Sequence, residues 1–442
     1  MTLENTEKKL ERIINNKLPA GWRWVKLGEV CKLKNGFAFK STKYKIDGIP
    51  VIRISDIKDG IVSANNAVKV KPDQEYENYL VENDDILVAM SGATTGKFGI
   101  FKSKEKAYQN QRVGKFKILD ENILNSHFLY HQIHALKRQI EKDAYGGAQP
   151  NISSTKIEQM EVALPPLSEQ HAIVSKIEEL FSELDKGKQQ LETTQQKLKV
   201  YRQAVLKWAF EGRLTNRSVK EDELPKGWKL SDLKAITSVL GDGLHGTPKY
   251  SESGEYYFIN GNNLNNGKIE IKENTKQVTL EEYEKYKKPL NERTILVSIN
   301  GSLGYTAFYN GEKVVLGKSA CYFNVLDNVD KYYVRYYLTS SSFTRYAEDR
   351  ATGSTIKNVG LKAMREFRIP MPPTVEEQQI IVQEIESRLS VCDKVEETIA
   401  TSLQQAETLR QSILKRAFEG KLITVSKISN VRSLGSGKDV VK

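Results

Sequence analysis

The 442-residue sequence has only three cysteines, Cys31, Cys321 and Cys392, and they lie far apart. Because none of them forms a CxxC pair, the sequence disfavours a disulfide framework and a cysteine-based zinc site. No apolar run approaches the roughly 18 residues of a membrane span. The charged start MTLENTEKKLERIINN lacks the apolar core of a secretory signal. We therefore expect a cytoplasmic protein with no membrane partner.

The composition is that of a globular chain with surplus positive charge. Hydrophobic residues make up 39% and charged residues 28%, and the formal net charge is +11 with a pI near 9.1. Such a surplus favours a polyanionic partner, with nucleic acid first and an anionic membrane surface second. The length allows two or three domains with substantial cores.

The sequence repeats itself at about half its length. Two similar units joined in one polypeptide let a single chain imitate a two-fold dimer whose halves can differ. The repeated segments are LPAGW at 18–22 and LPKGW at 224–228, EQHAIVSKIEELFSELD at 169–185 and EQQIIVQEIESRLSVCD at 377–393, and RQAVLKWAFEGRLT at 202–215 and RQSILKRAFEGKLIT at 410–424.

Each copy alternates short β-rich runs with turn signals and then enters a helix. In the first copy the strand candidates are GIPVIRIS, DDILVAMSG and VGKFKIL, and apolar spacing predicts a helix over 125–142. In the second copy they are YYFIN, RTILVSIN, GYTAFYN and KSACYFNVL, and one helix is predicted over 329–349. This pattern predicts two mixed α/β domains.

A charge-rich, glycine-poor stretch follows each domain and carries apolar residues every seven positions, which indicates a coiled-coil seam. The alternative, a long helix packed on a domain surface, is disfavoured because two such helices would each need an apolar partner. The seam residues are Ile177, Leu184, Leu191, Leu198 and Val205 in the first stretch and Ile385, Cys392, Ile399, Ala406 and Ile413 in the second. A second row is predicted from Ile173, Leu180, Tyr201 and Trp208, with Val395 and Leu409 on the other stretch.

The first stretch is expected to be one long helix. If it runs over 167–212, its 46 residues span roughly 70 Å. Ser168 is the expected N-cap. Gly212 and Gly420 are the expected helix stops, and Gly187 is a candidate for a local bend.

Together these segments resemble the specificity subunit of type I restriction-modification systems. The resemblance rests on an LPxGW opening to each half, PP followed by EQ at the start of each helix, and a helix that closes with AFEGxL, all present twice. It implies an α+β fold in which two mixed α/β target-recognition domains are separated by two long helices that pair as an antiparallel coiled coil with pseudo-two-fold symmetry. It also implies that each domain reads one half of a bipartite, asymmetric DNA site and that helix length sets the spacer.

The resemblance implies partners rather than an active site. The chain would be non-catalytic and bind no cofactor itself. Double-stranded DNA, two methyltransferase subunits and restriction subunits would be its partners, with S-adenosylmethionine, ATP and Mg on those subunits. The expected segments are an N-terminal helical segment (1–17), a first recognition domain (18–166), a central helix (167–215), a second recognition domain (216–373), a distal helix (374–424) and a flexible tail (425–442).

The helices offer a candidate surface for those partners. Residues that recur at equivalent positions could bind two copies of one protein. We expect the methyltransferase subunits to dock on this surface, which includes Arg202, Lys207 and Trp208 in one helix and Arg410, Lys415 and Arg416 in the other.

DNA recognition is expected from polar and basic residues in turns that differ between the two copies, because such side chains read base edges and hold phosphates. The candidates in the first domain are Lys34, Asn35, Lys40, Arg53, Thr94, Thr95, Lys97, Gln109, Asn110, Gln111 and Arg112. Those in the second domain are His245, Thr247, Lys249, Asn260, Asn262, Asn263, Asn300, Ser302, Lys318 and Lys357.

Signals for chemistry within the chain are weak. GDGLHG at 241–246 fits GxGxxG, but the Thr-Pro after it does not continue the helix that pyrophosphate binding needs. LGKSA and SGATTGK miss the spacing of a phosphate loop. His127, His131 and His134 share a helical face, but no HExxH pattern supports a metal. The main rival interpretation is a tandem-domain coiled-coil scaffold without sequence-specific DNA binding, and a second is an enzyme with its own active site.

Overall fold

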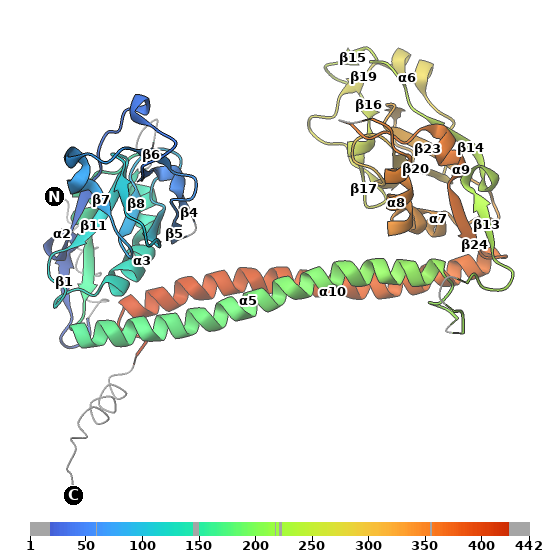
Figure 1. Cartoon of the computed structure of the whole chain (residues 1–442). Coiled ribbons are helices and arrows are strands. Elements are labelled where there is room, and N and C mark those ends of the chain that lie inside the picture. The colour runs from blue at the N-terminus through green and yellow to red at the C-terminus, as the bar shows by residue number, and fades with distance from the viewer. Residues whose placement is uncertain are drawn as a thin grey trace, which may run out of the picture. The chain divides into compact units, whose positions relative to one another are not determined.

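The computed structural model describes residues 18–58, 60–144, 150–216, 218–220, 223–353 and 356–423. The predicted N-terminal helical segment (1–17) and the predicted tail (425–442) lie outside these residues. The described chain has an α+β fold with two mixed α/β domains and two 44-residue helices, α5 (Leu167–Phe210) and α10 (Val375–Phe418) (Figure 1). The predicted fold class is therefore confirmed. In the part that the structure describes, no helix has the length and apolar character needed to cross a membrane.

The chain divides into two compact units, and each contains a globular domain together with half of each long helix. Of the described residues, unit 1 comprises those within 18–190 and 402–423, and unit 2 comprises those within 191–401. The helices are thus part of the packing of both domains rather than separate linkers.

The elements of unit 1 follow the predicted order of β-rich runs and then a helix. The larger sheet has the strand order β2 (Cys31–Asn35), β11 (Val113–Ile118), β8 (Ile86–Ala89), β9 (Phe98–Phe101), β5 (Gly60–Val62) and β4 (Ile57–Lys58). A second sheet has the order β6 (Val68–Val70), β3 (Ile49–Ile52), β10 (Ala107–Gln109) and β7 (Leu80–Val81), and β1 (Arg23–Lys26) pairs with β12 (Glu161–Leu164). The helices are α2 (Leu27–Val30), α3 (Ser126–Ala144) and α4 (Ser154–Glu158), with 3-10 turns η1 (Ser41–Lys43), η2 (Ile54–Asp56) and η3 (Gln74–Tyr79).

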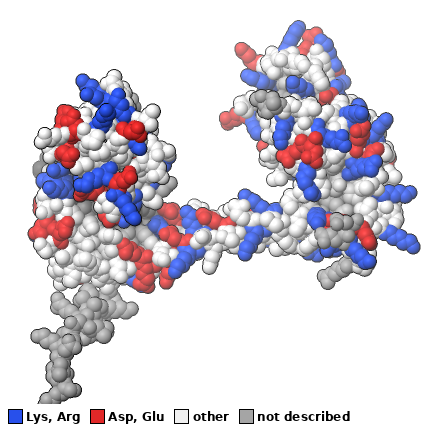
Figure 2. Space-filling model, in the orientation of Figure 1, with Lys and Arg blue, Asp and Glu red and all other residues white. Residues whose placement is uncertain are grey.

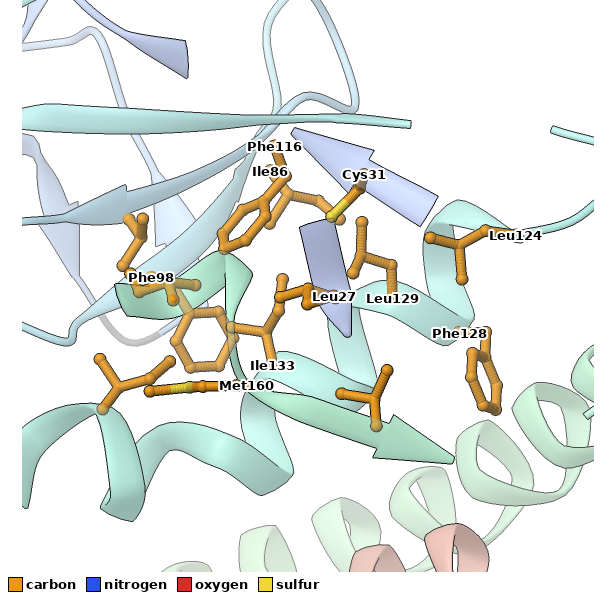
Figure 3. Close-up of a cluster of buried hydrophobic side chains, with 14 of the residues drawn as sticks. Leu27, Cys31, Ile86, Phe98, Phe116, Leu124, Phe128, Leu129, Ile133 and Met160 are labelled. Carbon is orange, nitrogen blue, oxygen red and sulfur yellow. The ribbon is translucent and has the colours of Figure 1, made fainter. Parts of the chain in front are cut away.

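The core of unit 1 lies between the larger sheet, α3 and the adjoining end of the long helices. Helix α3 buries Phe128, Leu129 and Ile133 because apolar residues three and four positions apart share one helical face. Figure 3 shows Ile133 and Leu129 on the side of α3 that faces Leu27 and the sheet, and Phe128 beside the long helices. The predicted helix over 125–142 is therefore confirmed as α3.

Unit 2 repeats this scheme with different loops. One sheet has the order β14 (Thr237–Asp242), β23 (Ala320–Val325), β20 (Thr294–Ser298) and β21 (Thr306–Phe308), and another has β15 (Tyr250–Ser251), β19 (Gln277–Val278), β16 (Tyr256–Ile259) and β22 (Val314–Leu316). Two further pairs are β17 (Leu264–Asn265) with β18 (Lys268–Ile269) and β13 (Lys229–Asp232) with β24 (Arg368–Met371). The helices are α6 (Leu280–Tyr286), α7 (Lys331–Leu338), α8 (Ser341–Arg350) and α9 (Leu361–Glu366), with 3-10 turns η4 (Leu233–Ile236) and η5 (Gly261–Asn263).

The prediction of one helix over 329–349 is wrong, because the structure has two helices there. Helix α7 ends before Thr339, and Ser340 has extended backbone angles. The hydroxyls of Thr339 and Ser340 donate to the carbonyls of Tyr336 and Tyr337, at 2.8 and 2.6 Å. Side chains that bond to nearby backbone in this way compete with the helical pattern, so the break has a local cause.

The long helices begin and end at repeated sequence features. The prediction of Ser168 as an N-cap is wrong, since α5 already begins at Leu167, directly after the Pro165–Pro166 pair. Helix α5 then continues without interruption through Gly187. The predicted helix stops are confirmed, since Gly212 and Gly420 follow the last helical residues with positive φ angles of 72° and 68°.

The two long helices pair in opposite directions within each unit. In unit 1, Ile177 of α5 shares a core with Ile413 of α10, and in unit 2, Leu206 of α5 shares a core with Ile385. All the predicted seam residues are buried or half-buried. Helix pairing and the antiparallel sense are thus confirmed.

The predicted second row of the seam is only partly correct. Tyr201, Trp208 and Leu409 are 38%, 38% and 49% exposed. The inward row instead contains Arg202 and Arg410, whose long side chains lie on the helix interface and pair with acidic residues of the other helix. Aliphatic stems of arginine can cover apolar surface, which apolar periodicity alone does not reveal.

All three cysteines are buried free thiols. Burial raises the pKa of Cys31 to about 12. A thiol with so high a pKa is protonated and unreactive at neutral pH.

Candidate nucleic-acid interface

The repeated tryptophan and glutamate fasten each domain to a long helix. The indole Nε1 of Trp22 donates to Glu169 of α5 at 2.8 Å, and that of Trp228 donates to Glu377 of α10 at 2.9 Å. A charged acceptor strengthens such a bond. The LPxGW and EQ segments are therefore parts of one joint that is built twice.

The repeated glutamine holds the start of each domain helix. The buried Gln170 accepts from the backbone N–H of Asn125 at 2.9 Å, just before α3. Gln378 accepts from the N–H of Asp330 at 2.8 Å, just before α7. The first N–H groups of a helix have no hydrogen-bond partner within the helix. Each glutamine accepts from one such N–H group and thereby holds α3 or α7 against a long helix.

A repeated glycine packs against a repeated proline. A Cβ added at Gly212 would lie 2.1 Å from Cγ of Pro225, and one at Gly420 would lie 2.2 Å from Cγ of Pro19. The proline is the second residue of LPxGW in both cases. The end of each long helix therefore packs closely against the first residues of a domain, and only glycine leaves room for the proline ring there.

In unit 1, the loops at one end of the larger sheet are joined by backbone hydrogen bonds. Phe37 N donates to Gln109 O at 2.8 Å, Met90 N to Arg112 O at 2.9 Å, and Gly92 N to Pro150 O at 2.9 Å. We call the loops 34–40, 53–56, 90–97, 109–112 and 150–153 the loop edge of unit 1.

Unit 2 has an equivalent loop edge, made of 242–249, 260–263, 299–305, 317–319 and 357–360. The same bonds recur there: Leu244 N donates to Leu316 O, Ile299 N to Ser319 O, and Gly301 N to Lys357 O, at 2.6, 3.0 and 2.9 Å. Because antiparallel neighbours β14, β23 and β20 bring these chain ends to the same edge, residues far apart in sequence lie close together.

Gly243 of the GDGLHG segment has a structural role at this edge. A Cβ added there would lie 2.2 Å from the carbonyl oxygen of Leu316, and one at the equivalent Gly36 would lie 2.2 Å from that of Gln109. The segment lies at the end of β14 and in the loop after it, and no helix follows directly. Close backbone approach therefore explains the glycine.

One turn shows how the two edges share a frame and differ in side chains. In unit 1, Arg53 N donates to Asp56 Oδ2 at 2.8 Å across η2. In unit 2, Asn260 N donates to Asn263 Oδ1 at 3.0 Å across η5. The same turn thus presents an arginine in one domain and an asparagine in the other.

Four of the predicted DNA-binding residues are buried and serve the loops themselves. Gln109 donates to Lys34 O and Val113 O at 2.7 and 2.6 Å. Thr95 donates to Gly92 O at 2.6 Å, and Asn263 donates to Glu270 O at 2.9 Å. The buried residues are Thr95, Gln109, Asn110 and Asn263.

The other predicted residues are at least partly open to solvent. In unit 1 the exposed ones are Lys34, Asn35, Lys40, Lys97, Gln111 and Arg112, and the half-buried ones are Arg53 and Thr94. In unit 2 the exposed ones are His245, Thr247, Lys249, Asn262, Ser302, Lys318 and Lys357, and the half-buried ones are Asn260 and Asn300. Lys357 pairs with Glu348 at 3.3 Å, and the backbone of Lys249 bonds to Glu282 of α6.

Part of the unit 2 edge is hollowed into a depression of about 550 Å³. It brings together His245, Asn300 and Lys318 from the predicted set with Asp242 and Asn358, which sequence reasoning missed. The backbone of Asn358 bridges to Asn300, as that of Asn151 bridges to Ser91 in unit 1. An asparagine therefore occupies the same place in both copies, and this repeat is the sequence signal that could have found Asn358.

The histidines of α3 lie among other partners. His127 contacts Glu178 at 3.0 Å, while His131 packs against the ring of Phe181 and His134 against that of Phe98. Burial lowers the pKa of His131 to about 4. Among the described residues, no group of three His, Cys, Asp or Glu side chains could hold a metal ion.

Lys and Arg are spread over both globular parts, with Asp and Glu between them (Figure 2). At the loop edge of unit 1 the exposed cations include Lys34, Lys40, Lys97 and Arg112. Such a surface can contact the phosphates of a nucleic acid while neutral and amide side chains reach the bases.

Known proteins share both the sequence and the fold. The family described as Type I restriction modification DNA specificity domain matches residues 19–193 and 225–405. The chain is 28% identical to the EcoBI specificity subunit of Escherichia coli, over 96% of this chain and 91% of that protein, and 25% identical to the EcoKI specificity subunit of Escherichia coli strain K12, over 92% and 90%.

Two solved structures show the fold. One, from work on assembly and conformational transition of the type I R-M system, has a TM-score of 0.69 at 20% identity and covers 92% of this chain and 100% of its own. The HsdS subunit from Thermoanaerobacter tengcongensis has a TM-score of 0.57 at 19% identity and covers 92% and 98%.

Proposed function

Because this chain belongs to the specificity subunits of type I restriction-modification systems, we propose that its two loop edges read the two halves of a bipartite, asymmetric DNA site. The observation that supports this is that the two loop edges share the same backbone turns and bonds but present different side chains, as at Arg53 and Asn260. A common frame places both edges on DNA in the same manner, while unlike side chains select unlike bases. Membership of a DNA-specificity family disfavours the rival of a scaffold without sequence-specific binding.

The residue types suit direct reading of bases. Arginine and lysine pair with the O6 and N7 acceptors of guanine, and asparagine and glutamine pair with adenine. In this proposal the open residues Arg53, Gln111 and Arg112 reach bases from unit 1, and Lys34, Lys40 and Lys97 hold phosphates. In unit 2, Asn260, Asn262 and Asn300 reach bases, with Lys318 and Lys357 near phosphates. Residues such as Gln109 keep the loops in shape.

The chemistry would belong to other subunits. We propose a non-catalytic cytoplasmic chain that docks two methyltransferase subunits on its long helices and, through them, restriction subunits. Equivalent positions such as Lys207 and Lys415 support docking of two copies of one protein. The fixed 44-residue length of α5 and α10 would set the spacer between half-sites.

Mapping of methylated bases tests the proposal in cells that carry this chain with its methyltransferase partner. We expect one bipartite, asymmetric motif with a fixed gap. A continuous palindrome would contradict the proposal.

Binding of the purified complex to that motif gives a second readout. We expect affinity to fall steeply with salt while preference for the motif over unrelated DNA persists. Equal affinity for both duplexes at every salt concentration would favour the scaffold. Methylation by the chain without partner subunits would show an active site of its own.

A further inference from the structure

The depression in unit 2 contains two asparagines that the backbone holds side by side. Asn300 and Asn358 form an isolated β-bridge, flanked by bonds from Gly301 N to Lys357 O at 2.9 Å and from Val359 N to Ile299 O at 2.8 Å. Their side chains are joined as well, since Asn300 Nδ2 donates to Asn358 Oδ1 at 3.3 Å. Both side chains are half-buried and line the depression. The pair is therefore a fixed feature of the loop edge.

The paired amides leave one acceptor and one donor for a ligand. An amide has one carbonyl oxygen and one NH2 group, so a single bond between two amides leaves the oxygen of one and the NH2 of the other wholly unused. Here these are Asn300 Oδ1 and Asn358 Nδ2, which have no hydrogen-bond partner in the described part of the chain. A bond in the reverse direction would leave the same set.

A neighbouring donor and acceptor match one base. In the major groove, adenine displays the N7 acceptor beside the N6 amino donor, whereas guanine displays two acceptors, cytosine a donor, and thymine an acceptor with a methyl group. We propose that Asn300 and Asn358 act as one unit that reads an adenine in the half-site of unit 2. This inference rests on the proposed function and adds the identity of a base to it.

Charged residues beside the pair fit a contact with the DNA backbone. Lys318 is exposed and lines the same depression. His245 lies there too, with Nε2 2.6 Å from Asp242 Oδ2 and a side chain that is 72% exposed. A lysine near the amides can bind a phosphate and so position the amides relative to the edge of the base. The carboxylate of Asp242 orients the imidazole of His245.

Unit 1 has the same bridge without the amide pair. Ser91 and Asn151 occupy the equivalent places, and Ser91 Oγ is buried without a partner in the part of the chain that the structure describes. A hydroxyl beside one amide does not reproduce the arrangement of Asn300 and Asn358. The adenine contact is therefore specific to unit 2, and Asn300→Ser converts its pair to the residues found in unit 1.

The test uses the full chain bound to its methyltransferase partner. Mapping of methylated bases first defines the two half-sites. Competition binding then compares duplexes in which each adenine, on either strand, is replaced in turn by 7-deazaadenine, which lacks N7. We expect one adenine of one half-site at which the replacement costs the wild-type complex about tenfold or more in affinity.

Variants assign that adenine to the pair. Asn358→Ala removes the donor to N7 and should lose sensitivity to 7-deazaadenine at this position and keep it elsewhere. Asn300→Ser removes the acceptor for the N6 amino group, and the methylation motif of both variants should relax at this position alone. Asn358→Asp keeps the shape and removes the donor, so it should lose the same preference even if Asn358→Ala does not fold. Asn328→Ala changes an exposed asparagine at the opposite end of β23 and should behave as wild type.

Two outcomes would overturn the inference. In one, the Asn358 variants keep the wild-type sensitivity at every adenine. In the other, they lose affinity equally for all duplexes, which is the result expected of a purely structural pair. Both leave a bipartite motif in the wild type, so they are distinct from failure of the proposed function, in which the wild type has no such motif.

Discussion

Arg410 of α10 lies over the ring of Phe181 of α5, with 4.2 Å between the guanidinium carbon and the ring centroid. The same guanidinium pairs with Asp185. At the equivalent place in unit 2, Arg202 pairs with Asp393 at 2.6 Å and Glu396 at 3.0 Å. Both arginines therefore join the long helices by ion pairs, and Arg410 also stacks on an aromatic ring.

This difference predicts unequal responses to salt. Arg202→Leu and Arg410→Leu should each lower the free energy of unfolding by about 1 kcal/mol at low salt. At high salt the loss should shrink more for Arg202→Leu than for Arg410→Leu, because ions screen the ion pairs of both arginines but screen the stacking of Arg410 on Phe181 less. Urea unfolding at two salt concentrations measures both. An equal salt dependence would contradict the assignment.

The packing of glycine on proline predicts a second pair of variants. Gly212→Ala and Gly420→Ala should each lower the free energy of unfolding by roughly 1 to 3 kcal/mol, because a Cβ is strained at a positive φ and meets Pro225 or Pro19. Gly187→Ala is the matched control, since nothing lies within 4 Å of its Cβ. Alanine should stabilise α5 there by about 0.5 to 1 kcal/mol. Thermal unfolding of the three variants measures these changes. A loss of stability in all three variants would contradict the prediction.

The buried His131 predicts a loss of stability in acid. Burial lowers its pKa to about 4 in the fold, whereas an unfolded histidine titrates near pH 6.5. The unfolded chain therefore binds the proton first, so this residue lowers stability progressively as the pH falls from about 6.5 to about 4, by about 3 kcal/mol at most. Above pH 6.5 the effect is absent.

His131→Phe should remove this pH dependence and keep the ring contact with Phe181, now 5.8 Å between centroids. The free energy of unfolding of the variant, relative to that of wild type, should therefore be larger at pH 4.5 than at pH 7.5. His127→Phe, at an exposed position, is the control. Chemical unfolding at the two pH values measures the gain. A wild-type pH slope in His131→Phe would contradict the prediction.

The sequence was sufficient for the features that repeat or follow a period. Apolar spacing located α3, α5 and α10, and the duplicated AFEG segments located the glycines that end the long helices. The LPxGW and EQ segments were found as repeats, but the contact between Trp22 and Glu169 is seen only in the fold. The same reasoning missed the break at Thr339, because the hydroxyl bonds that cause it are local and leave the apolar spacing intact.

The candidate site was less accessible to sequence reasoning. Polar residues in turns were found as a group, but the sequence could not separate Gln109, which is buried and supports the loops, from Arg112, which is exposed. Asn358 was missed because its partner Asn300 is 58 residues away, and the backbone bridge and the amide bond that join them form only in the fold. Burial and long-range pairing decide these roles.

The central claim is that each unit reads its own half of one DNA site. It is tested most directly by mapping methylated bases for Arg112→Ala in the loop edge of unit 1 and Asn262→Ala in that of unit 2, each co-expressed with the methyltransferase partner. We predict that each variant relaxes or weakens one half of the motif, a different half in each case, while the other half and the central gap stay unchanged. A change in both halves by either variant, or in the same half by both, would contradict the account.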